Sequence, residues 1–254
     1  MPLIGSPGAP LWDPTAVPAA TVIVLRDGRN GPEVLMLQRD KGLSFAGGMW
    51  VFPGGRIDDA DRSPDDPSGT DEALEHAARR AAVREAAEEA GLVIDPDAIR
   101  RWTHWTPPPL QDKRFSTAFF VAPAVDATTE VVIDDGEIRA HRWARPAEVL
   151  EGRDTGDLQL TPPTYITLVQ LLAHRSVEAV MDAAGRAEVE HFSTRVALPD
   201  DDTSRRGWTA VYHGDTVFEA LGDAGGAGKV DLDQPGPRHR LVMAEQWTYV
   251  REGC

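Results

Sequence analysis

Three glutamates near the end of a predicted helix are the residues of this sequence best suited to chemistry. Glu85, Glu88 and Glu89 are spaced i, i+3 and i+4, so a helix places their carboxylates on one face. Like charges at this spacing repel each other, and the negative end of the helix dipole adds to the cost. A divalent cation between the carboxylates would reverse both penalties, and Mg²⁺ and Mn²⁺ prefer oxygen ligands. The same spacing is also typical of a solvated acidic helix face.

The flanking residues predict the helix that positions these glutamates. Thr70 or Asp71 is a suitable N-cap and Gly91 follows the last helical residue, which gives a helix over 71–90. The wall opposite the glutamates is almost entirely alanine, so the helix can pack closely against a sheet and fix the carboxylate geometry. This wall comprises Ala78, Ala81, Ala82 and Ala86.

Further elements are predicted on both sides of this helix, where runs of β-branched and aromatic residues alternate with turn residues. The predicted strands are residues 20–25, 33–38, 49–52, 101–106, 114–122 and 138–143. A short helix follows Pro146, and a longer one is predicted over 163–183. This part of the chain is therefore predicted to contain both strands and helices.

The segments around the glutamates resemble the Nudix box, GX5EX7REUXEEXGU. Phe52-Pro53-Gly54-Gly55 precedes the helix, and Arg84-Glu85-x-x-Glu88-Glu89-x-Gly91-Leu92 lies within it. The resemblance implies a Nudix-type α/β/α sandwich with a mixed sheet. It also implies a hydrolase that attacks a diphosphate linked to another group, with water as the nucleophile.

The resemblance also implies roles for individual residues. Glu85, Glu88 and Glu89 match the glutamates that bind Mg²⁺ or Mn²⁺ in the family. Gly54 matches the glycine whose carbonyl can be a further metal ligand. Arg84 matches the arginine that orients the carboxylates.

The sequence departs from the Nudix pattern between its glycine and its arginine. Gly55 and Arg84 are 29 positions apart where the pattern has 14, so about 15 residues are inserted. The position eight residues before the arginine, a glutamate in the pattern, holds His76, which puts the anchoring of the loop in doubt. We expect the acidic segment 57–70 to be a solvated, mobile loop because it offers almost nothing apolar to bury.

Similarity outside the box points to one branch of the family. Segments at 35–39, 48–55, 102–107, 114–120 and 160–164 resemble the branch of the peroxisomal coenzyme A diphosphatases. The substrate implied first is coenzyme A or acyl-CoA, followed by NADH, ADP-ribose and other nucleoside diphosphate derivatives. A non-catalytic module that senses a nucleotide is the alternative class, and the intact glutamate set argues against it.

Four residues outside the box are candidates for substrate contact or proton transfer. Arg39 is placed to pair with a substrate phosphate, or is a surface arginine. Trp105 and Phe115 either stack on an adenine or belong to the core. Glu137 is a candidate further ligand or general base, or is a surface glutamate.

Composition narrows the function classes. The 254 residues carry 26 basic and 41 acidic side chains, a net charge of −15, which disfavours binding to nucleic acid. The one cysteine, Cys254, cannot form an internal disulfide, and this fits a reducing cytoplasm. No secretory signal and no membrane span are predicted.

Three parts of the chain differ in composition. Residues 1–18 are rich in proline and are predicted to form an extended arm, 19–185 form the Nudix hydrolase domain, and 186–254 form a β-rich extension. The extension is too small for an independent core, so we expect it to pack on the hydrolase domain or on a second copy in a homodimer. Its predicted strands are 209–212, 216–220 and 241–250.

Overall fold

A computed structural model describes the chain over residues 11–110, 112–125, 130–133, 136–199, 207–223 and 225–254. The chain divides into two compact units. One comprises Pro18–Thr103 and Thr117–Glu190, and the other comprises Met1–Val17, His104–Ser116 and His191–Cys254. Among the described residues, no helix combines the length and the apolar character needed to cross a membrane.

A large sheet forms the centre of the first unit. Its strands β1 to β7 span Val17–Gly28, Gly31–Arg39, Trp50–Val51, Gly54–Arg56, Arg100–Thr106, Phe115–Pro123 and Ile138–Ala144. They are ordered β3-β2-β1-β6-β5, while β4 also pairs with β1 and β7 with β2. Consecutive apolar residues of β1, Val22 to Leu25, are fully buried, which indicates that both faces of the sheet are covered.

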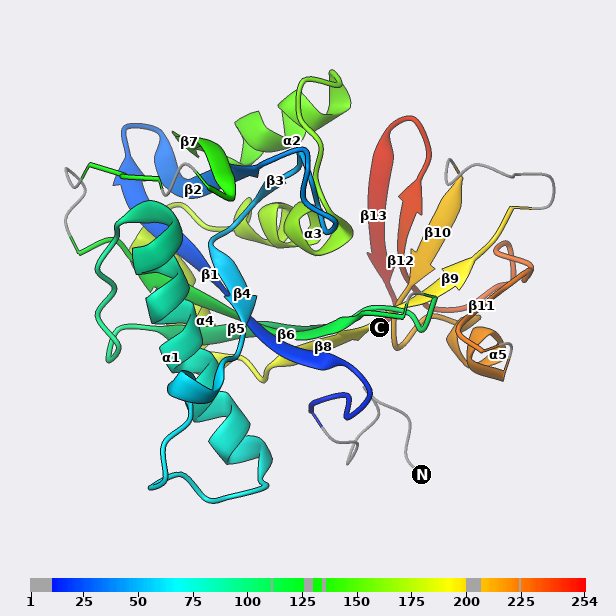
Figure 1. Cartoon of the computed structure of the whole chain (residues 1–254). Coiled ribbons are helices and arrows are strands. Elements are labelled where there is room, and N and C mark those ends of the chain that lie inside the picture. The colour runs from blue at the N-terminus through cyan, green and yellow to red at the C-terminus, as the bar shows by residue number, and fades with distance from the viewer. Residues whose placement is uncertain (1–10, 111, 126–129, 134–135, 200–206, 224) are drawn as a thin grey trace. The chain divides into compact units, whose positions relative to one another are not determined.

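Helices cover this sheet on two sides (Figure 1). Helix α1, Asp71–Ala90, lies in front of β1, and α3, Pro162–Leu171, and α4, Val177–Arg186, lie behind it. Helix α2, Pro146–Asp154, packs against α3. The predicted α/β/α architecture is confirmed.

The boundaries of α1 agree with the prediction, and its alanine wall is buried. The hydroxyl of Thr70 accepts a hydrogen bond of 3.1 Å from the Ala73 N–H, and Gly91 ends the helix in the left-handed conformation at φ 65°. The buried alanines are Ala77, Ala78, Ala81, Ala82, Ala86 and Ala90. Their small side chains bring the backbone of α1 close to the sheet.

The single long helix predicted over 163–183 is wrong, because the chain forms α3 and α4 there. Ser176 begins α4 as its N-cap, with its hydroxyl accepting a hydrogen bond of 3.2 Å from the Ala179 N–H. The Val177 N–H donates 2.9 Å to Oδ1 of Asp27. These two bonds satisfy N–H groups of a new helix start, so the break is stabilised locally.

The second unit contains the predicted C-terminal β structure. Its five-stranded sheet has the order β11-β9-β10-β12-β13. Strands β9 to β13 span Arg195–Ala197, Trp208–Val211, Ala227–Gly228, Arg238–Met243 and Trp247–Glu252. Strand β8, Glu190–Ser193, belongs to the larger sheet, in which it neighbours β5.

Two strand predictions in this unit are wrong. Residues 216–220 lead into a short helix, α5 (Phe218–Asp223), because Oδ1 of Asp215 accepts from the Val217 N–H at 3.1 Å and turns the chain. Residues 241–250 hold parts of two antiparallel strands, with Met243 opposite Trp247, rather than one strand. Residues 1–10 of the predicted arm lie outside the described residues.

Candidate active site

Glu89 lies at the meeting point of three elements. Its Oε2 accepts a 2.9 Å hydrogen bond from the Gly54 N–H of β4, and its Oε1 lies 3.4 Å from Nη1 of Arg39, the last residue of β2. Only 6% of the residue is exposed. Burial is the main cause that raises the pKa of Glu89 to about 8, with a further contribution from the negative charge of Glu85.

Glu85 packs against the glycine pair before the helix. A β-carbon at Gly55 would collide with the Glu85 carboxylate, and one at Gly54 would lie 2.6 Å from the carbonyl oxygen of Ala20. The Gly54-Gly55 pair therefore lets strand β4 approach both β1 and the carboxylate. Burial also raises the pKa of Glu85, and the charge of Glu88 adds to the rise.

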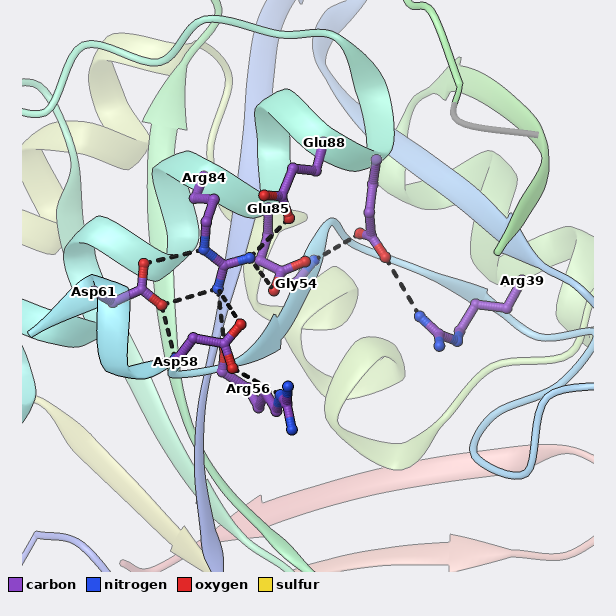
Figure 2. Close-up of polar contacts among 9 residues, drawn as sticks. Arg39, Gly54, Arg56, Asp58, Asp61, Arg84, Glu85 and Glu88 are labelled. Atoms are coloured by element: carbon purple, nitrogen blue, oxygen red, sulfur yellow. Dashed lines mark hydrogen bonds and ion pairs between the residues drawn. The ribbon is translucent and has the colours of Figure 1, made fainter. Parts of the chain in front are cut away.

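Arg84 uses every donor of its guanidinium (Figure 2). Nε and Nη2 donate to the two carboxylate oxygens of Asp61 at 3.0 and 2.9 Å, and Nη2 also donates 3.2 Å to the Arg56 carbonyl. Nη1 donates to Glu85 and Glu88, both at 2.8 Å. Five N–H groups thus have five acceptors. Asp61, followed by the two glutamates, raises the pKa of Arg84 above its ordinary value.

Asp61 is the residue of this site that the sequence analysis missed. It lies in the inserted segment, six residues after Gly55, where the Nudix pattern has its first glutamate when counted forward from the glycine. Counting back from Arg84 gives His76 instead. The residue is only 4% exposed, and its carboxylate binds Arg84 at both oxygens. The GX5E spacing, applied forward from Gly55, is the signal in the sequence that identifies Asp61.

The expectation that segment 57–70 has almost nothing to pack is wrong, while most of its residues are exposed as expected and its mobility stays a prediction. Residues 59–61 form a 3-10 turn, and the Asp61 carbonyl accepts 2.5 Å from Nε of Arg80 on α1. The Asp66 carboxylate also binds Arg80, and Nδ1 of His76 lies 2.9 Å from it. Cationic and imidazole side chains of the helix thus add polar contacts to the little apolar burial of the segment, which Ile57 provides.

Arg39 lies between two carboxylates from different parts of the first unit. Its Nη2 is 2.9 Å from Oε2 of Glu137, while its Nη1 faces Glu89. The carbonyl of Glu137 also accepts 2.7 Å from the Asp40 N–H. The structure thus brings two candidates, Arg39 and Glu137, to the glutamate helix. Asp134 and Asp135, which precede Glu137, lie outside the described residues.

The two aromatic candidates belong to the second unit. Trp105 is 3% exposed and stacks on Phe192, with ring centroids 4.0 Å apart and planes 8° apart. Tyr212 meets the Trp105 ring edge-on at 5.8 Å. This is a core position, the alternative that the sequence left open. Phe115 is partly exposed, and Nζ of Lys113 lies 5.3 Å from the centre of its ring.

The donor set fits a hard divalent cation, although its geometry is not preformed. The carboxylates of Glu85 and Glu89 are both withdrawn from solvent, both have raised pKa values, and their negative charges repel each other. A bound cation would compensate the loss of solvation and the repulsion. Across the part of the chain that the structure describes, no three acidic, histidine or cysteine side chains converge as ready metal ligands. The reason is visible at Arg84, whose Nη1 holds Glu85 and Glu88.

Comparison with known proteins finds similarity to two acyl-coenzyme A diphosphatases and to a NUDIX hydrolase of known structure. Acyl-coenzyme A diphosphatase NUDT19 from Xenopus laevis is 30% identical over 78 residues, and that from Gallus gallus is 25% identical over 149. These segments cover 29% and 57% of this chain but only 20% and 39% of the relatives, so the match spans less than half their length. The crystal structure of a NUDIX hydrolase from Alicyclobacillus acidocaldarius matches with a TM-score of 0.58 and 26% identity, covering 66% of this chain and 96% of that one.

A model of the NUDIX domain matches residues 16–162, more than half of the chain. This range contains the Gly54-Gly55 turn, the inserted segment and the glutamate helix α1. It also contains Arg39 and Glu137, which the fold brings to Glu89. The chain therefore belongs to the Nudix hydrolase family.

Proposed function

We propose that this protein hydrolyses the diphosphate linkage of a nucleoside diphosphate derivative in the presence of Mg²⁺ or Mn²⁺. The observation that carries the proposal is the burial of Glu85 and Glu89 together against the Gly54-Gly55 turn. Burying two neighbouring carboxylates is unfavourable unless a cation or a proton compensates them. An acidic surface face would leave both in solvent.

Four groups would hold the cation: the carboxylates of Glu85, Glu88 and Glu89 and the carbonyl oxygen of Gly54. A divalent cation bound there supplies positive charge to the diphosphate oxygens and lowers the pKa of water. The chain is acidic overall, so this positive charge is also what would make an anionic substrate bind. We expect Mn²⁺ and Mg²⁺ both to support activity, since both accept oxygen ligands.

The protein's own residues would orient the reacting groups. Arg84 fixes the rotamers of Glu85 and Glu88 through its two Nη1 bonds. Glu137 forms an ion pair with Arg39, which also contacts Glu89. We assign to Glu137 the removal of a proton from the attacking water. We assign Arg39 to a substrate phosphate, because its Nε is buried and has no hydrogen-bond partner among the described residues.

Coenzyme A or acyl-CoA is the substrate that we propose first. Support comes from the two NUDT19 relatives, which are named acyl-coenzyme A diphosphatases. The test is product release from coenzyme A, acetyl-CoA, NADH and ADP-ribose with Mg²⁺ or Mn²⁺. We expect the highest kcat/KM for a coenzyme A substrate, and a clear preference for NADH or ADP-ribose would reassign it.

Variants of the glutamates separate an enzyme from a nucleotide-sensing module. We expect Glu88→Gln and Glu89→Gln to lower turnover by about two orders of magnitude or more, because each removes a charged ligand. Glu72→Gln is a matched control, since Glu72 is an exposed glutamate of the same helix. Nucleotide binding without hydrolysis of any substrate in the panel would favour the sensing module.

A further inference from the structure

We infer that Asp40 is a positioning residue that places Glu137 for proton transfer, through a β-bulge at Arg139. The inference rests on the proposed function, in which Glu137 removes a proton from the attacking water. Asp40 follows the last residue of β2, and Glu137 precedes the first residue of β7. The two residues therefore lie at the same end of one antiparallel strand pair.

The pairing of β2 with β7 contains one extra residue at this end. Gln38 lies opposite Ala140 in the regular part of the ladder, but the next residue, Arg39, lies opposite Ile138. Arg139 is thus the extra residue of a bulge. In a regular ladder Arg39 would lie opposite Arg139, and like charges in that arrangement are destabilising. Bulges are common beside active sites, where they redirect a side chain.

Asp40 contacts both the bulged residue and the candidate base. Its backbone N–H donates 2.7 Å to the carbonyl of Glu137. Its Oδ2 accepts 2.5 Å from Nε of Arg139. The hydrogen bond from Arg139, followed by one from the Gly42 N–H, lowers the pKa of Asp40, so the carboxylate is ionised at neutral pH. One residue after β2 therefore holds the bulge with its side chain and Glu137 with its main chain.

The turn after β2 fixes Asp40 without the help of Arg139. Oδ1 of Asp40 accepts 2.8 Å from the Gly42 N–H, and the Asp40 carbonyl accepts 3.2 Å from the Leu43 N–H. A β-carbon at Gly42 would lie 3.0 Å from Oδ1, so glycine lets the turn close tightly against the carboxylate. Asp40 is therefore the fixed partner, and the bulged arginine adapts to it.

The direction of Glu137 depends on polar contacts more than on packing, because its side chain is 55% exposed. Arg39, whose Nη1 faces Glu89, holds the Glu137 carboxylate at 2.9 Å. Asp40 holds the main chain of the same residue. Loss of the Asp40 charge would release Arg139 from the turn, and the bulge next to Glu137 would relax. The carboxylate would then move relative to the glutamates of α1.

The experiment compares kcat and KM of full-length variants with Mn²⁺ and the best substrate of the panel. Asp40→Asn should lower kcat by about tenfold, because a misplaced base slows the chemical step. KM should change by less than about twofold, since Arg39 and the cation sites keep their own contacts. Asp40→Glu should recover part of kcat. Asp182→Asn is the matched control and should leave kcat unchanged, because Asp182 forms an exposed ion pair with Arg186 within α4.

A double-variant cycle separates positioning from simple stabilisation. If Asp40 acts through Glu137, Asp40→Asn should cause little further loss of kcat in a Glu137→Gln background. If Asp40 only stabilises the fold, the two losses should multiply. Should Asp40→Asn fail to fold, Arg139→Gln takes its place in the cycle, since it removes the same ion pair from an exposed side chain.

The outcomes separate this inference from the proposed function. A wild-type protein that hydrolyses no substrate of the panel contradicts both. Unchanged turnover in Glu137→Gln contradicts the role of Glu137 and with it the inference, while metal-dependent hydrolysis stands. Loss of turnover in Glu137→Gln, combined with a wild-type kcat in Asp40→Asn or with losses that multiply, contradicts the inference alone. Losses that do not multiply support it.

Discussion

The N–H of Gly54 donates a 2.9 Å hydrogen bond to Oε2 of Glu89, which joins the turn before the inserted segment to the last turn of α1. The two residues are 35 positions apart, and the whole insertion lies between them. This bond holds the buried carboxylate beside the turn whatever the length of the intervening chain. The insertion can therefore differ from the family pattern without moving the glutamate.

Glu89 should make the metal-free protein less stable as the pH rises. Its pKa is raised to about 8 from an ordinary value of 4.5. Between these values the folded protein keeps a proton that the unfolded chain releases, so the free energy of unfolding falls with rising pH. Above about pH 8 both forms are ionised and this contribution is constant. Chemical denaturation in EDTA from pH 5 to 8.5 measures the effect.

Glu89→Gln should flatten that pH dependence, because the amide does not titrate and can still accept from Gly54. At pH 8 the variant should be more stable than the wild type in EDTA. Glu72→Gln, on the exposed part of the same helix, should keep the slope of the wild type. A Glu89→Gln variant with the slope of the wild type would show that other groups cause the pH dependence.

Gly55→Ala should lower turnover strongly, although the substitution adds only one methyl group. The added β-carbon would collide with the Glu85 carboxylate, so strand β4 or the carboxylate must move. Overpacking of this kind costs about 1–3 kcal/mol, and displacement of a candidate ligand should lower turnover by about an order of magnitude or more. The control is Gly185→Ala, in a helix with open space around the new methyl group. Wild-type turnover in Gly55→Ala would contradict the assigned geometry.

The inserted segment should contribute to stability. Asp66→Asn removes the carboxylate that binds Arg80 and His76, so we expect a lower melting temperature in metal-free buffer. The adjacent Asp65 is exposed, and Asp65→Asn should leave the melting temperature nearly unchanged. Equal melting temperatures for the two variants would show that these contacts do not stabilise the fold and would favour the expected mobile loop.

The core of the second unit should depend on Phe192. This side chain is fully buried and stacks on Trp105, so Phe192→Ala should lower the free energy of unfolding by about 3–5 kcal/mol. Phe45→Ala is the matched control, because Phe45 is 53% exposed.

A chain shortened at residue 185 lacks Phe192 and should be poorly soluble. A soluble and fully active shortened chain would contradict this prediction.

The predicted homodimer is tested separately. Two-fold association is the commonest assembly of soluble proteins, and the 186–254 extension is our proposed contact surface. Light scattering of the full chain should give twice the mass of one copy at micromolar concentration. A single-copy mass across the accessible concentration range would exclude the dimer.

Local signals in the sequence determined helix α1 and part of the site. The cap at Thr70, the left-handed Gly91 and the alanine wall predicted α1 with its observed bounds. The spacing of Glu85, Glu88 and Glu89 placed three carboxylates on one helix. Signals of this kind act within a few residues, so the sequence alone contains them.

Tertiary structure decided how the other groups meet those glutamates. Arg39 reaches Glu89 across 50 positions, and Asp61 reaches Arg84 across 23, through side chains whose directions depend on the packing of β2, β4 and α1. The breaks that split 163–183 and 241–250 also depend on local turns and on a distant acceptor, Asp27. Burial decided the rest, because Glu85 and Glu89 acquire raised pKa values only where the sheet and the glycine turn exclude water from them.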